Sequence, residues 1–269
     1  MAGPGALVPA ADTGNAPIAP GTSLYIHGYS GGEQTRWLER TLAAGRRDET
    51  VDWIIVQMHQ CAASSSSTGN GSDLGIRQEW LPLFDRYQVD LVLCGHDHDY
   101  ERSFPVRGAD TDAGREVATG AVVNTLRPHP VTTTDGGVFD TSHGTVHLVL
   151  GCGGTDAPLD EYGTDSQRQA KVFTRADRPV PSSLPGVFTR AAADAVEDAI
   201  WSARRDTTTG YGIAVFDVDP GSGSDGQPSI KVTHYHAVGA DPVNPATGTK
   251  GAPTPDYTEF ETFTLVRPR

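Results

Sequence analysis

Residues 89–102 read Val-Asp-Leu-Val-Leu-Cys-Gly-His-Asp-His-Asp-Tyr-Glu-Arg, an apolar segment followed by a polar one with two histidines. An aliphatic run at 91–94 reaches Gly95 and then changes to polar residues. A short apolar run that ends at glycine is typical of a buried strand leading into a loop. The loop carries His96 and His98, and neutral imidazole is the commonest metal-ligating side chain. The pattern predicts a metal-binding loop, and the alternative is a pair of ordinary surface histidines.

An upstream segment supplies a third histidine. Residues 51–58 form a second near-continuous apolar run, which ends at His59. A Ser/Gly-rich loop at 62–72 and a helix at about 75–87 then lead to the strand at 91–94. This order predicts a βαβ unit with two parallel strands buried on both faces. Because ligands bind at the carboxyl ends of strands in open α/β sheets, we expect the three histidines to converge on one metal site.

Composition excludes several classes of protein. The chain has 269 residues, enough for a full hydrophobic core, and a formal net charge of −13. Such a surface repels nucleic acid and anionic membranes, so we expect neither as a partner. No apolar run is long enough for a transmembrane helix, and no signal peptide is visible, which leaves localisation undecided. Cys61, Cys94 and Cys152 are odd in number and far apart, which argues against a disulfide framework and a Cys-based zinc site.

The remaining chain is predicted as one domain over 23–269, preceded by a disordered lead-in at 1–22 that is rich in Ala, Gly and Pro. A surface excursion is expected at about 155–190. His234 and His236 form a second His-x-His inside an alternating strand, and we interpret them as a polar sheet face. The other expected elements are a strand at 24–26, a helix at 33–45, short strands within 108–143, a strand at 145–150, a helix at 191–204, and strands at 211–218, 229–238 and 257–266.

Two blocks carry a family resemblance. Val56-Gln57-Met58-His59 and Gly95-His96-Asp97-His98, followed by Tyr100-Glu101-Arg102, resemble the last two metal-binding blocks of the calcineurin-like metallophosphoesterases. The form of the second block is closest to purple acid phosphatases. The resemblance covers about residues 24–154 well and the C-terminal strands loosely. It implies a mixed α/β fold, a four-layer αββα sandwich in which two sheets are flanked by helices.

The resemblance also implies a chemistry. In this family two cations, Fe with Zn, Mn or Fe, lie between the sheets and hydrolyse phosphate monoesters. By matching position, His59 and His96 would share one metal and His98 would bind its neighbour. The substrate would be a small phosphate ester or a phosphoprotein, and relatives of this type are often exported. The resemblance assigns no further catalytic residue to a position in this chain.

The family's first three blocks have no counterpart here. Gly-Asp-x-Gly, Gly-Asp-x-x-Tyr and Gly-Asn-His-Glu/Asp are all absent from residues 1–58, where Gly14-Asn15 is followed by Ala16. Neutral imidazoles supply no negative charge to offset the repulsion between two cations, which the missing bridging carboxylate would do. We therefore expect a partial sandwich that lacks its N-terminal strands, arising from a truncated gene product, a mis-called start or one piece of a split protein.

Three functions follow as alternatives. The first is a metal-dependent phosphoric-monoester hydrolase, incomplete in this chain. The second is a non-catalytic fragment, or a half that depends on a missing N-terminal partner and binds one Zn-like ion or none. The third is a secreted acidic binding module built on the C-terminal β-rich part, in which the histidines are incidental.

Overall fold

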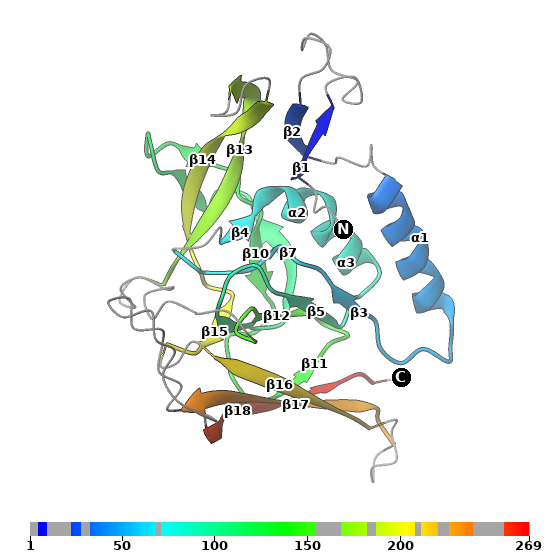
Figure 1. Cartoon of the computed structure of the whole chain (residues 1–269). Coiled ribbons are helices and arrows are strands. Elements are labelled where there is room, and N and C mark those ends of the chain that lie inside the picture. Colours follow the sequence, from blue (N-terminus) through cyan, green and yellow to red (C-terminus); the bar gives the residue numbers. More distant parts are fainter. Residues whose placement is uncertain are drawn as a thin grey trace.

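A central five-stranded sheet organises the fold (Figure 1). Its strand order is β15-β6-β12-β5-β3, in which β3, β5 and β12 are parallel to one another, while β6 is antiparallel to both of its neighbours, β12 and β15. The parallel pair β3–β5 confirms the predicted βαβ arrangement. The strands are β3 (Ile55–Gln57), β5 (Leu91–Cys94), β6 (Tyr100–Ser103), β12 (Val146–Leu150) and β15 (Ser202–Arg205).

The structure is a computed structural model. It describes residues 5–9, 23–27, 33–67, 71–153, 168–181, 187–207, 211–219, 226–238 and 256–268.

Helices cover one face of the central sheet. They are α1 (Glu33–Arg47), α2 (Leu74–Glu79) and α3 (Leu81–Arg86). The helix expected at 75–87 is interrupted at Trp80, and Pro82 lies in the first turn of α3, where its missing N–H costs no helical hydrogen bond. The carboxylate of Asp73 caps α2 by accepting from the backbone N–H groups of Gly75 and Ile76. None of the described helices is long and apolar enough to cross a membrane.

A second, four-stranded sheet packs against the other face of the central sheet, so the layers run helices, sheet, sheet (Figure 1). Apolar side chains of both sheets form the core between them, among them Leu91, Leu148, Val232 and Phe263. The mixed α/β class and the three C-terminal strands are confirmed. The strands are β11 (Val138–Asp140), β16 (Gly212–Asp219), β17 (Ser229–Val238) and β18 (Asp256–Val266), in the order β11-β18-β17-β16.

His234 and His236 were interpreted as a polar sheet face, and the structure shows that this face of β17 lies in the interface between the two sheets rather than in solvent. His234 is buried and stacks on the ring of Tyr100 with a centroid distance of 3.7 Å. His236 bonds to Asp206 at 2.9 Å between Nδ1 and Oδ2. Both rings point toward the central sheet because the inner face of β17 forms part of the interface between the two sheets.

The other strands lie outside these layers. β7 (Val106–Asp110) pairs with β10 (Arg127–Pro130). A third sheet contains β1 (Gly5–Pro9), β2 (Ser23–His27), β4 (Ser72–Asp73), β8 (Gly114–Glu116), β9 (Val122–Val123), β13 (Gln169–Pro181) and β14 (Val187–Asp198).

The helix expected at 191–204 is wrong, because this segment forms the end of β14 and all but the last residue of β15. Ala195 pairs with Val172 across the ladder, and Ala195 and Glu197 are buried while Asp198 is exposed. This alternation has the period of a strand rather than of a helix. β1 lies within the residues of the expected lead-in and β13 within those of the expected excursion, and the predicted domain bounds stay a prediction. The rest of the lead-in, residues 154–167 and residues 182–186 lie outside the described residues.

Candidate metal centre

Two loops bring the predicted histidines together. His59 follows β3, and the loop containing His96 and His98 follows β5. The strands are parallel neighbours, so their carboxyl ends meet at one edge of the sheet. The backbone N–H of Gly95 donates to the carbonyl of His59 at 3.1 Å, which ties the two loops to each other.

His59 and His96 are in direct contact. Nδ1 of His96 lies 2.9 Å from Nε2 of His59, and the rings meet edge to face at 86°. One nitrogen donates to the other, and the tautomer decides which. Imidazole nitrogens are donor atoms that a metal ion of this kind binds, and the two nitrogens face each other, so His59 and His96 could hold one ion together. The donor set therefore fits the metal that the motif implies.

His98 lies close to this pair without joining it. It is half-buried. Burial is the largest cause that lowers the pKa of His96, and the nearby rings of His59 and His98 act in the same direction. Among the described residues, no three His, Cys, Asp or Glu side chains are grouped as a complete metal site. The structure thus brings His59 and His96 into contact and leaves His98 beside them. The roles of all three histidines as metal ligands stay a prediction.

The carboxylates of Asp97 and Glu101 point away from the histidines and bond to serines. Asp97 is buried, and its Oδ2 accepts from the hydroxyl of Ser64 at 2.5 Å. Glu101 is also buried and accepts from the backbone N–H and the hydroxyl of Ser65 at 2.6 and 2.7 Å. Burial raises the pKa of Glu101, while its hydrogen bonds to Ser202 and Ser65 act in the opposite direction.

These serines were missed in the sequence, where 62–72 was interpreted as a loop. Ser64, Ser65 and Ser66 are fully buried. The run of four serines at 64–67 is the signal that could have found them, because short hydroxyl side chains can satisfy buried carboxylates at little cost in volume.

The backbone of the histidine loop is strained. His96 has φ of +64°, a left-handed conformation that few residues other than glycine adopt. The loop also packs closely on the turn after β12, where a Cβ on Gly151 would lie 1.8 Å from the carbonyl oxygen of Asp97. Only glycine fits there without movement of the loop.

An apolar groove of about 900 Å³ lies beside the pair, between α1 and β3. β3 is the edge strand, and its Ile55 is 44% exposed, so the prediction that both faces of this segment are buried is wrong. Trp37 on α1 is 56% exposed at the same groove. The groove reaches His59, which is among the residues that line it.

Comparisons with known proteins agree with the motifs. Residues 8–100 match the family model described as Calcineurin-like phosphoesterase. A purple acid phosphatase of Glycine max is 34% identical over 143 residues, which cover 53% of this chain and 27% of that protein. The chain is purple acid phosphatase-like, and it matches the calcineurin-like phosphoesterases over residues 8–100. The resemblance inferred from the two histidine blocks is thereby confirmed.

Two further relatives bear on this purple acid phosphatase-like chain. An uncharacterized protein of Mycobacterium tuberculosis is 45% identical over 249 residues, covering 93% of this chain. The chain spans 41% of the length of that relative. The Fe(3+)-Zn(2+) purple acid phosphatase 12 of Arabidopsis thaliana is 39% identical over 70 residues, covering 26% of this chain and 15% of that protein.

Proposed function

We propose that this chain carries part of a dinuclear metal centre for the hydrolysis of phosphate monoesters. The observation that supports it best is the 2.9 Å contact between His59 and His96 at the carboxyl ends of adjacent parallel strands. The family relationship adds the reaction class. We expect a small phosphate ester or a phosphoprotein as substrate and no nucleic acid, because the net charge of −13 disfavours polyanions.

Each histidine has a defined part in this proposal. His59 and His96 would hold one ion through their facing nitrogens, and His98 would hold the second. By the name of the Arabidopsis relative, iron and zinc are the first metals to test. A pair of bound cations supplies a clamp for phosphate oxygens and acidifies water for attack. The part of the protein is to hold the three imidazoles at one edge of the sheet.

Hydrolysis of p-nitrophenyl phosphate with added zinc, iron or manganese tests the proposal. We expect metal-dependent turnover that His96→Ala abolishes. His143→Ala is the matched control, because this histidine has a side chain that is 75% exposed and should leave turnover unchanged. Turnover that is equal in the wild type and His96→Ala would contradict the assignment of the site. No turnover with any metal would contradict a catalytic role for this chain and favour the non-catalytic candidate described next.

The second candidate is a non-catalytic, partner-dependent half that binds at most one metal ion. The outer edge of β3 favours it, since no described strand pairs with that edge and an edge beside an apolar groove is a surface that a further strand can extend. Metal analysis after exhaustive dialysis separates the two candidates. One ion or none per chain agrees with the second candidate, whereas two tightly held ions per chain would refute it.

A further inference from the structure

A buried polar network lies behind the histidine loop. Asp97 stands between His96 and His98 and directs its carboxylate to the opposite side, where the hydroxyl of Ser64 donates to it at 2.5 Å. The backbone N–H of Gly71 lies 3.4 Å from the other carboxylate oxygen. Because Ser64 and Asp97 are both buried, this contact is shielded from water and worth more than a surface hydrogen bond.

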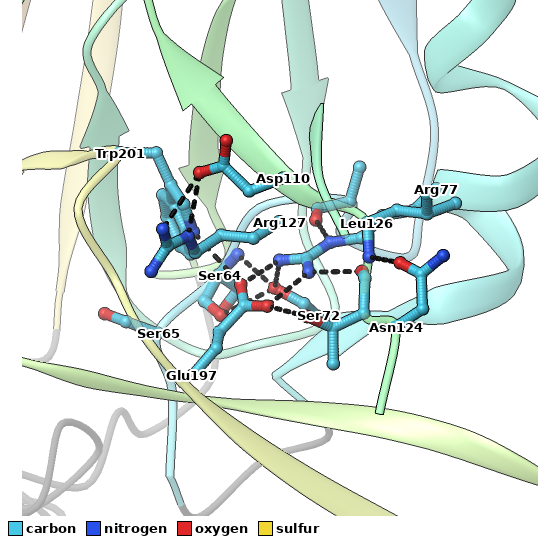
Figure 2. Close-up of polar contacts among 12 residues, drawn as sticks. Ser64, Ser65, Ser72, Arg77, Asp110, Asn124, Leu126, Arg127, Glu197 and Trp201 are labelled. Carbon is cyan, nitrogen blue, oxygen red and sulfur yellow. Dashed lines mark hydrogen bonds and ion pairs between the residues drawn. The ribbon is translucent and has the colours of Figure 1, made fainter. Parts of the chain in front are cut away.

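Ser64 is itself fixed to the core. The hydroxyl of Ser72 donates to the carbonyl of Ser64 at 2.9 Å and accepts from Nη2 of Arg77 at 2.9 Å. Arg77 makes a two-pronged ion pair with Glu197 at 2.8 and 3.0 Å, and both side chains are fully buried. Figure 2 shows the guanidinium group between Glu197 and Ser72, with Ser64 beside them. The serine loop is therefore a fixed support.

The serine loop supports a backbone conformation at His96 that is unfavourable for residues other than glycine. His96 lies in the left-handed region, so the loop would relax to another shape if nothing held it. The residue that follows His96 is Asp97, whose side chain is held by Ser64 and whose carbonyl packs on Gly151. Releasing Asp97 would free His96 to turn away from His59.

We propose that Ser64 is a positioning residue for the metal centre. By holding Asp97, it keeps His96 in the conformation that faces His59, although neither Ser64 nor Asp97 would touch the ion. This inference rests on the proposed function for its consequence, which is metal affinity. Its structural part, the contact between His59 and His96, can be measured without metal.

Metal affinity is the first test. The metal-free full chain is titrated with Co²⁺ and followed by its visible absorption. We expect Ser64→Ala to weaken Co²⁺ binding about 10-fold or more, the effect typical of losing a group that orients a ligand. Ser103→Ala is the matched control, since Ser103 is also a buried serine whose hydroxyl accepts one hydrogen bond, from the backbone N–H of His147 at 2.8 Å. Equal affinity in Ser64→Ala and the wild type, or equal weakening by Ser103→Ala, would overturn the proposal.

A reciprocal variant covers the case in which Ser64→Ala does not fold. That change removes the hydroxyl that donates to the buried carboxylate of Asp97, whereas Asp97→Ala removes the charge itself and is the milder change. Asp97→Ala should weaken Co²⁺ binding to a similar extent. The double variant should bind no more weakly than Asp97→Ala, because both changes break the same contact. Full affinity in Asp97→Ala, or an additive loss in the double variant, would count against the proposal.

The second measurement needs no metal. In the metal-free protein, nuclear Overhauser contacts between the ring protons of His59 and His96 should be present in the wild type and Ser103→Ala and lost in Ser64→Ala. Contacts that persist in Ser64→Ala would overturn the positioning role, whatever the metal result. If the wild type binds no Co²⁺ while the contacts follow this pattern, the proposed function fails and the positioning role of Ser64 stands.

Discussion

Acid sensitivity of the fold should depend on His147. This histidine is the second residue of β12, is fully buried, and has no hydrogen-bond partner for either ring nitrogen among the described residues. Burial lowers the pKa of His147 from 6.5 to about 3, and the charge of Arg77 contributes in the same direction. A protonated imidazole in this position would carry an unsolvated charge, so the folded protein keeps the ring neutral.

The sign and size of the effect follow from this shift. Below pH 6.5 the unfolded chain takes up a proton at His147, while the folded protein does not until the pH approaches about 3. The free energy of unfolding therefore falls as the pH falls through this window, at about 1.4 kcal/mol per pH unit once the unfolded histidine is protonated. Between pH 7 and pH 5 the loss from this one group is about 2 kcal/mol.

His147→Leu should remove this loss. Leucine has a similar volume and no polar atoms, so the free energy of unfolding at pH 7 should change by about 1.5 kcal/mol or less. Urea unfolding followed by tryptophan fluorescence at pH 7 and pH 5 measures both proteins. The drop in unfolding free energy should be about 2 kcal/mol smaller in His147→Leu than in the wild type. His143→Leu at an exposed position is the control and should show the drop of the wild type. An equal drop in His147→Leu and the wild type would refute the reasoning.

Three further outcomes test other parts of the structure. Glu197→Ala should cost about 3–5 kcal/mol in urea unfolding because it leaves the guanidinium of Arg77 buried without its counter-ion, whereas the double change Arg77→Met/Glu197→Leu should cost much less. If both variants lose equally, the cost is not that of an unpaired charge. Gly151→Ala should cost at least about 1 kcal/mol because its Cβ would collide with the histidine loop, whereas Gly153→Ala, where a Cβ meets no atom within 4 Å, should not. Equal costs would mean that the loop has room to move. Added zinc should raise the thermal unfolding midpoint of the wild type, and His59→Ala should remove that rise; a rise that persists would place the zinc elsewhere.

The meeting of His59 and His96 could be predicted from the sequence because it depends on strand direction alone. An apolar run, a helix and a second apolar run imply parallel strands, whose carboxyl ends share an edge. The local sequence pattern was sufficient here because His59 follows the apolar run at 51–58 and His96 follows Gly95, which ends the run at 91–94.

What could not be predicted depends on contacts between distant segments. The alanine-rich stretch at 191–204 has helical propensity, but pairing with β13 and the buried contact of Glu197 with Arg77, 120 residues away, make it a strand. The serine run resembles a solvated loop until Asp97 and Glu101, more than 30 residues further along, are placed against it. Tertiary partners, rather than local propensity, decided both cases.

The balance of charge at the centre decides what a two-metal site would still require. Three neutral imidazoles contribute no negative charge, and two cations a few ångströms apart repel each other strongly. Asp97 and Glu101 lie on the same loop and strand, but they are buried against Ser64 and Ser65 and point away from the histidines. Among the described strands, β5 pairs with one side of β3 and none pairs with the other, so the edge of β3 and its groove give an approach to His59. A two-metal site therefore requires a bridging carboxylate other than Asp97 and Glu101, and the groove beside His59 is open to one.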